Sequence, residues 1–202
     1  MLYQGEPDIE RYRKKQRGFS LATTLVLLVI LMGLGLAASQ VVLLSERTSR
    51  FQRDSQIAFQ AAEAALLDAE FDIRGPNVHA NQRGDLFTGH MNDAQSFTGG
   101  CGTGLYAGLC LPSTNPVWYS VDFTDEAATN TARLGQFTGR SFPAGAGNLR
   151  SAMLPRYIIE IIPDLQPGSD VADSRALYRI TAVGFGPHKK TQSVLQTVFR
   201  KD

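Results

Sequence analysis

The longest apolar stretch of the chain runs from Phe19 to Leu44 and contains no charged residue. Nineteen of its 26 residues are apolar, and the glycines Gly33 and Gly35 interrupt it without adding charge. A bilayer core needs about 20 apolar residues in a helix, whereas a soluble helix keeps one polar face. The pattern therefore predicts a helix that spans a membrane.

Charged residues on either side of this stretch predict its orientation. Five cations lie within residues 11–17, before the stretch, whereas the first charges after it are of both signs. Because cations are retained on the cytoplasmic side, we expect the N-terminus in the cytoplasm and export of the chain beyond residue 45. The alternative is a secretory signal cleaved near residues 37–39, but its apolar region would span only about 7–15 residues.

Apolar residues recur at helical spacing beyond residue 50 and predict that the same helix continues. No proline occurs between Pro7 and Pro76, so nothing forces a break before Gly75-Pro76. We therefore expect one helix over residues 19–74, with its second half amphipathic and packed on a globular head. The positions expected to face the head are Phe51, Ala58, Phe59, Ala62, Ala65, Leu66, Ala69 and Ile73.

The rest of the chain, residues 76–202, predicts a head with an antiparallel sheet, and with the helix this makes an α+β fold. Glycine and short polar residues in the region 76–116 indicate loops, and residues 124–154 have no regular pattern. Alternating and β-branched segments indicate strands, of which the last two form a hairpin. The expected strands are residues 117–123, 156–162, 176–183 and 191–199.

The junction before the apolar stretch, KKQRGFSL at residues 14–21, joins a basic run, one glycine and an aromatic residue. It resembles the class III signal peptide of type IV prepilins, which a membrane-embedded prepilin peptidase cuts after the glycine before it methylates the new N-terminal amine. The resemblance implies a leader of residues 1–18, cleavage between Gly18 and Phe19, and methylation of Phe19. The alternative is a turn at the start of an uncleaved anchor.

Three further segments resemble the PilX family of minor pilins. Residues 55–70, which contain AAEAALLDAE, resemble the helix of that family, and residues 178–186 and 194–200 resemble its closing strands. The resemblance implies the type IV pilin architecture. Its parts would be the membrane and filament-core half of the helix, the amphipathic half and the periplasmic head, at residues 19–45, 46–75 and 76–202.

The same resemblance implies a structural protein rather than an enzyme, with no cofactor. A PilX-like minor pilin primes pilus assembly within an initiation or tip complex and so supports piliation, twitching motility and adhesion. Its implied partners are other minor pilins, the major pilin, the prepilin peptidase, the inner-membrane assembly platform and a large tip adhesin. It would span the inner membrane once, with its head in the periplasm, before it enters the pilus tip at the cell surface.

Two other functions stay open. One is that of a type II secretion minor pseudopilin at the pseudopilus tip, which a larger head and a clear calcium site would favour. The other is that of an uncleaved periplasmic binding module on a single-pass anchor.

Thr23 departs from the pilin pattern. Counting from Phe19, it is the fifth mature residue, where most type IV pilins carry a glutamate that pairs with the N-terminal amine of a neighbouring subunit. Threonine offers no charge, and a carboxylate buried without that amine would be costly. The difference favours a position at the pilus tip, where no neighbour's amine needs a partner. The alternative is that an auxiliary pilin tolerates its absence.

Composition and cysteine count add two expectations. A net charge of +1 argues against nucleic-acid binding through overall basicity, and 43% hydrophobic residues argue against a disordered chain. Cys101 and Cys110 are the two cysteines, and export to an oxidising compartment favours a disulfide between them.

Candidate metal-binding and catalytic residues are sparse. The three histidines are scattered among predicted loops without ligand spacing, so we expect them at the surface. Asp164, Asp170 and Asp173 share one loop, but their spacing does not match a calcium-binding loop, and no metal site is predicted.

Overall fold

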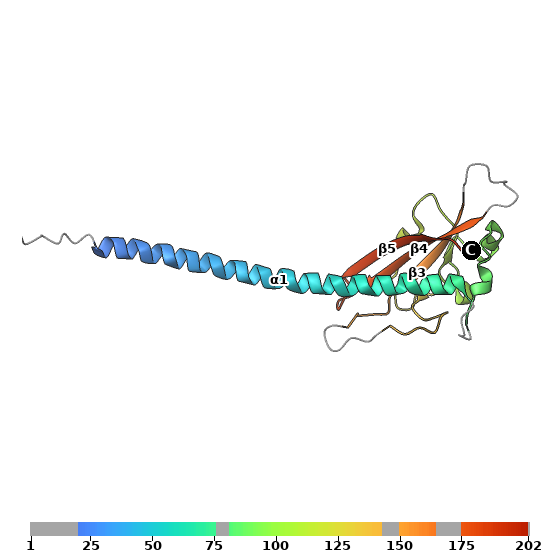
Figure 1. Ribbon diagram of the computed structural model, residues 1–202, viewed down its shortest axis with the longest axis horizontal. Coiled ribbons are helices and arrows are strands. Elements are labelled where there is room, and N and C mark those ends of the chain that lie inside the picture. The colour runs from blue at the N-terminus through green and yellow to red at the C-terminus, as the bar shows by residue number, and fades with distance from the viewer. Residues whose placement is uncertain (1–19, 76–80, 143–149, 165–174, 202) are drawn as a thin grey trace, which may run out of the picture. The chain divides into compact units, whose positions relative to one another are not determined.

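The computed structural model describes residues 20–75, 81–142, 150–164 and 175–201, and the chain divides into two units between Thr48 and Ser49 (Figure 1). Helix α1, Ser20–Arg74, crosses this division. In the first unit, all described side chains from residue 20 to residue 48 are exposed. At the far end, Gly75 has a positive φ of 38° and its N–H lies 3.2 Å from the carbonyl oxygen of Phe71. The helix therefore ends where the Gly-Pro pair predicts.

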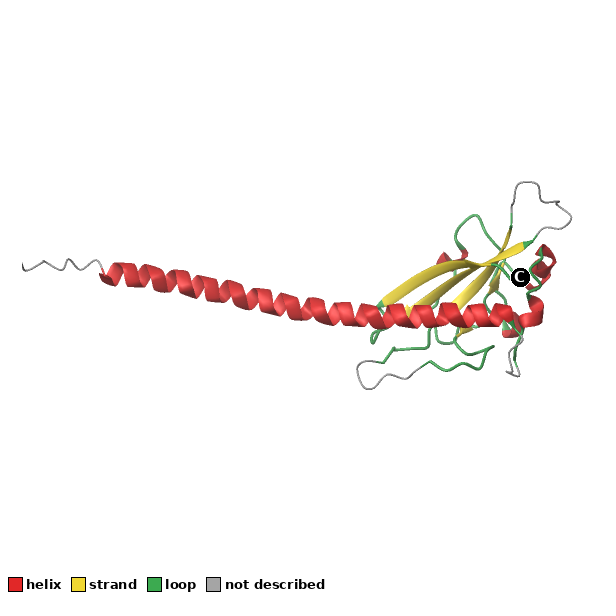
Figure 2. Ribbon diagram, viewed as in Figure 1, coloured by secondary structure: helices red, strands yellow, loops and turns green. Residues whose placement is uncertain are grey.

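The second unit is built on one mixed sheet with the order β1-β3-β4-β5, in which β2 also pairs with β3 (Figure 2). All strand pairs are antiparallel except β1 with β3, which is parallel. The strands are β1 Leu109–Cys110, β2 Ala132–Arg133, β3 Arg156–Pro163, β4 Ala176–Phe185 and β5 Gln192–Phe199. Short 3₁₀ helices lie at η1 Gly84–Leu86, η2 Met91–Ser96, η3 Gly104–Tyr106 and η4 Val117–Tyr119.

This combination of a long helix and a sheet confirms the predicted α+β class. The strands expected at 156–162, 176–183 and 191–199 correspond to β3, β4 and β5, which differ from the predicted bounds by one or two residues. The sheet is mixed rather than wholly antiparallel, because the short strand β1 enters beside β3 in the same direction.

The strand predicted at residues 117–123 is wrong. The segment begins with η4, and its apolar side chains Val117, Val121 and Phe123 are 3–8% exposed without belonging to a strand. Local hydrogen bonds replace strand pairing, since the N–H of Ser120 donates to the carbonyl of Val117 over 2.9 Å. The Asp122 carboxylate likewise accepts the N–H of Thr124 over 2.8 Å. Serine and aspartate favour such turns, which the alternation of apolar residues does not reveal.

The core lies on both faces of the sheet. On one face, Ala65, Ala69 and Ile73 of α1 pack with side chains of β3 and β4 such as Tyr157 and Ile180. On the other face, a second buried cluster joins the sheet to loops; its members are Cys101, Cys110, Val117, Val121, Phe123, Ile158, Val183 and Phe185. Side chains alternate between faces along a strand, so β3 and β4 are apolar almost throughout.

Helix α1 approaches β4 until their backbones are in contact at Gly184. A Cβ atom at this position would lie 2.1 Å from the carbonyl oxygen of Ala58 and 2.2 Å from the nitrogen of Ala62. The alanines on this face of α1 are fully buried; they are Ala58, Ala61, Ala62, Ala65 and Ala69. A glycine opposite a row of alanines therefore sets the distance between helix and sheet.

Two of the residues expected to face the head do not pack against it. Phe51 is 67% exposed and Phe59 is 40% exposed. Gly186, the residue after β4, lies against α1 at Asp54, whose carbonyl oxygen would be 2.7 Å from a Cβ built at Gly186. Phe51 comes before this contact. Phe59 comes directly after the buried Ala58 and lies about 100° further around the helix. It is therefore at the edge of the buried face. The apolar arc was thus predicted too broadly.

We predict that Gly184→Ala destabilises the head by about 1–3 kcal/mol, because the added methyl group forces helix and sheet apart. The free energy of unfolding of the full chain in detergent, followed by urea titration, measures the effect. Gly100→Ala is the matched control, since a Cβ there would meet no atom of the described residues within 4 Å apart from its two chain neighbours. Equal stability of the two variants would contradict the close contact.

Candidate functional site

The N-terminal part of α1 is long and apolar enough to cross a membrane. Its most apolar 18-residue window has a mean hydropathy of 2.5, and none of that window is buried. Its side-chain hydroxyls bond to the helix's own carbonyls: Thr23 donates to Ser20 over 2.9 Å and Ser39 donates to Leu36 over 2.9 Å. The segment therefore presents an apolar surface on which the hydroxyls of Thr23, Thr24 and Ser39 are bonded within the helix.

Thr23 lies in a shallow groove on this helix surface. The groove has a volume of about 260 Å³ and is lined by Ala22, Thr23, Val26, Leu27 and Ile30. Thr23, which the predicted cleavage makes the fifth residue of the mature chain, thus lies among apolar side chains and carries no charge. Gly18 and Phe19, between which cleavage is predicted, lie outside the described residues.

The second half of α1 carries a buried ion pair at its end. The carboxylate of Asp72 accepts bonds from Arg83 at 2.7 Å (Nη2) and 3.1 Å (Nε), and both side chains are fully buried. The hydroxyl of Tyr157 on β3 donates to the same carboxylate over 2.9 Å. Burial, followed by the charge of Asp72, raises the pKa of Tyr157 well above its ordinary value. The tyrosine therefore stays protonated and acts as a donor.

Arg83 extends this contact to the loop closed by the two cysteines. Its Nη1 donates to the carbonyl oxygens of Leu105, over 2.8 Å, and of Ala107, over 2.7 Å. The guanidinium carbon lies 3.5 Å from the ring centroid of Phe137, within the range of a cation–π contact. One arginine thus joins the helix to two segments of irregular backbone.

Asp68, one turn earlier on α1, makes a second buried contact. Its carboxylate accepts the N–H of Gly135 over 2.8 Å and the hydroxyl of Thr138. Burial raises the pKa of Asp68 above its ordinary value, and the bonds from Thr138 and Gly135 act in the opposite direction. Both aspartates thus fasten loops of the head to the helix.

The sequence prediction missed Asp68, Asp72 and Arg83. The two aspartates were not among the positions expected to face the head, and Arg83 lies in a segment expected to form loops. One feature of the sequence does point to them. The two aspartates are four residues apart and alternate with Ala65 and Ala69 on the buried face, where an unpaired carboxylate would be costly.

Cys101 and Cys110 form the disulfide that the sequence predicts. Both are buried, and they belong to the core cluster on the sheet face opposite α1. The loop between them is tight, because a Cβ at Gly102 would lie 2.2 Å from the carbonyl oxygen of Tyr106. The disulfide and Arg83 therefore hold the same loop from two sides.

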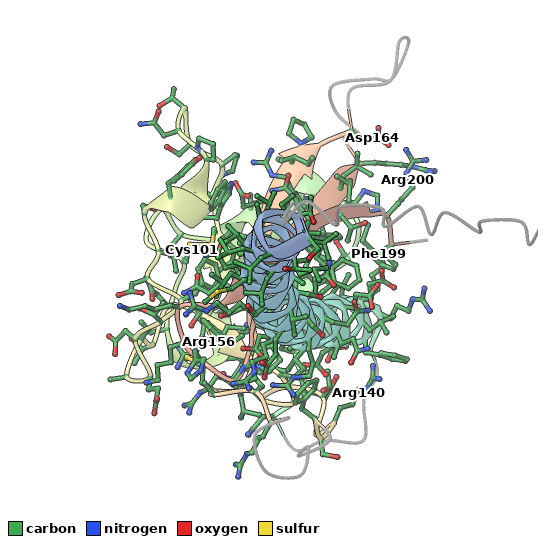
Figure 3. The ribbon with its side chains drawn as sticks, turned by 90° about the vertical axis from the view of Figure 1, so that its left-hand side faces the viewer. Cys101, Arg140, Arg156, Asp164, Phe199 and Arg200 are labelled. Atoms are coloured by element: carbon green, nitrogen blue, oxygen red, sulfur yellow. A yellow bond between two sulfur atoms is a disulfide. The ribbon has the colours of Figure 1, made fainter. Side chains whose placement is uncertain are left out.

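The predicted acidic loop is described only in part. Asp164 forms an ion pair with Arg200 at 2.6 Å, whereas Asp170 and Asp173 lie outside the described residues. Figure 3 shows Asp164 and Arg200 close together, on the side of the head away from Cys101. Within the described ranges, no group of three or more His, Cys, Asp or Glu side chains could hold a metal ion.

Two family models match the chain. Residues 17–67 match the model described as PilX N-terminal, and residues 89–201 match the model described as type IV pilus assembly protein PilX C-term. The first match spans the apolar stretch and much of the amphipathic helix, and the second contains all five strands. Comparisons with characterised proteins and with solved structures gave no significant match.

We predict that Asp72→Ala destabilises the chain by about 3–5 kcal/mol, because it leaves the Arg83 guanidinium buried without its anion. The double variant Asp72→Ala, Arg83→Met should lose less than the sum of the two single losses. Unfolding by urea measures all three. Glu70→Ala is the control, because its pair with Arg74 is long, at 3.9 Å, and only half-buried on the Glu70 side, so it should contribute less than about 1 kcal/mol. Additive losses would show that the pair is not coupled.

Proposed function

The chain belongs to the PilX family of type IV pilus assembly proteins, and from this membership we propose that it is a minor pilin that primes pilus assembly. In this proposal it acts with other minor pilins in an initiation complex at the pilus tip. It contacts the major pilin and the assembly platform, and it helps to carry a large tip adhesin. Piliation, twitching motility and adhesion then depend on it indirectly.

The exposed apolar surface of α1 supports a role in polymerisation. Leu25, Leu28 and Leu31 are 58–63% exposed on the isolated chain, and the described large apolar side chains of the segment are all at least 56% exposed. Such a surface is stable only in lipid or against other apolar helices. We propose that the inner membrane holds this segment first, with the head in the periplasm, and that a filament core holds it afterwards.

Processing of the N-terminus completes the proposal. Removal of the leader, residues 1–18, would start the mature chain at Phe19 and leave Thr23 as its fifth residue. Methylation of the Phe19 amine would follow. With no carboxylate at Thr23, the subunit suits the tip, where no neighbour presents an amine to be paired.

Deletion of the gene should abolish surface pili if the protein primes assembly, because no other step would nucleate the filament. Pili counted by electron microscopy measure the effect, and expression of the intact chain from a plasmid should restore them. Normal piliation in the deletion strain would refute a priming role.

Mass spectrometry of the native protein should find a mature chain that begins with methylated Phe19. The same measurement separates this proposal from an uncleaved anchor. An intact Met1 at the N-terminus of the purified protein would exclude a processed pilin.

Thr23→Glu should reduce the number of pili, because it places a carboxylate in an apolar groove that has no amine partner at the tip. Thr23→Ser is the control, since it keeps the hydroxyl and the uncharged surface. Pilus counts give the result, and the amount of processed protein shows whether the variant is still inserted and cleaved. Unchanged counts with Thr23→Glu would argue that this position does not place the subunit at the tip.

A further inference from the structure

Two arginines lie directly opposite each other on neighbouring strands of the head. Arg133 of β2 is the register partner of Arg156 of β3. Like charges in this position destabilise a sheet. Burial and, after it, the charge of Arg133 lower the pKa of Arg156, which agrees with this repulsion. The pair therefore favours an anion close by.

Arg156 is 1% exposed and its partners are uncharged. Its guanidinium donates to the hydroxyl of Thr131 over 2.9 Å and to the carbonyl oxygen of Glu126 over 2.9 Å. Its Nε atom is buried and has no partner in the described part of the chain. The ion pairs found between described residues do not include Arg156. A buried charge without an opposite charge bonded to it is costly. An anion bound to Arg156 would therefore be stabilising.

The carboxylates whose charges act on Arg156, those of Asp122, Asp125 and Glu126, are engaged elsewhere. Asp122 accepts the N–H of Thr124 over 2.8 Å, and Asp125 accepts the N–H of Ala127 over 2.8 Å. Glu126 forms an ion pair with Lys189. They reduce the positive potential around Arg156 without bonding to it.

A pocket of about 200 Å³ opens beside the two arginines. It is lined by Glu126, Arg133, Ala152, Met153, Leu154 and Arg156. Arg133 and Leu154 are both exposed, so a ligand can reach a cation and an apolar wall together. Figure 3 shows Arg156 on the same side of the head as Cys101 and away from the ion pair of Asp164 with Arg200.

We propose that this pocket binds a carboxylate carried on a short apolar group, with the carboxylate against Arg133 and Arg156. The guanidinium fork matches a carboxylate, and residues 152–154 contact the apolar group. With Glu126 paired to Lys189, the two arginines leave the pocket positive, which matches one negative charge. The ligand is either a free small acid or the side chain of a glutamate flanked by apolar residues in another protein.

The test uses the full chain in detergent micelles with ¹⁵N-labelled arginine. Titration with 4-methylpentanoate should give a saturable shift of the Nε–H resonances of Arg133 and Arg156. The uncharged 4-methylpentanamide and inorganic phosphate should bind at least about tenfold more weakly, since one lacks the charge and the other lacks the apolar group. Arg133→Gln should lose the same factor, and its thermal midpoint shows that it is folded.

Arg175→Gln is the matched control. Arg175 is also exposed, but it precedes Ala176, which pairs with Pro163 at the end of β3 opposite Arg156. Its affinity for 4-methylpentanoate should equal that of the unmodified chain. The peptide acetyl-Leu-Glu-Leu-amide distinguishes the sources: tighter binding than the free acid indicates a protein ligand, and weaker binding indicates a small acid. No saturable shift, an unchanged affinity in Arg133→Gln, or tighter binding of phosphate would each overturn the proposal.

Discussion

The backbones of α1 and β4 touch at Gly184, where one added methyl group would lie 2.1 Å from the carbonyl oxygen of Ala58. This separation agrees with the composition of the helix face, where the small side chains of Ala58, Ala61 and Ala62 are fully buried beside the strand. It also brings the carboxylates of α1 within reach of groups on the sheet. The bond from Tyr157 to Asp72 depends on that short distance.

The buried carboxylates explain how a head with little regular structure is held together. Much of the chain between residues 81 and 142 consists of turns and short 3₁₀ helices, which supply few ladder hydrogen bonds. Asp68 binds the backbone at Gly135, and Asp72 binds Arg83, which in turn binds the carbonyls of Leu105 and Ala107. The helix thus takes the place of neighbouring strands as the partner of these loops. The disulfide between Cys101 and Cys110 fixes one of them a second time.

The pattern of apolar and β-branched residues predicted the helix and the three long strands, because the helix shows a period of 3.6 and each strand is a short run rich in such residues. It failed at residues 117–123, where Ser120 and Asp122 form local bonds, and at Phe51, which precedes the contact with the sheet. The burial of Asp72 could not be read from the pattern, since its partner Arg83 lies in a segment without periodicity. The pocket beside Arg156 depends on the pairing of two short distant segments, which sequence spacing does not encode.

The hydroxyls of Thr23, Thr24 and Ser39 each donate to a carbonyl one turn earlier in α1. These polar groups therefore need neither water nor a partner chain to complete their hydrogen bonding. These three hydroxyls add little to the difference in solvation energy between lipid tails and other apolar helices, because neither surrounding must supply them with an acceptor. In the proposed transfer from the membrane to the filament, these hydroxyls would therefore add little cost of desolvation.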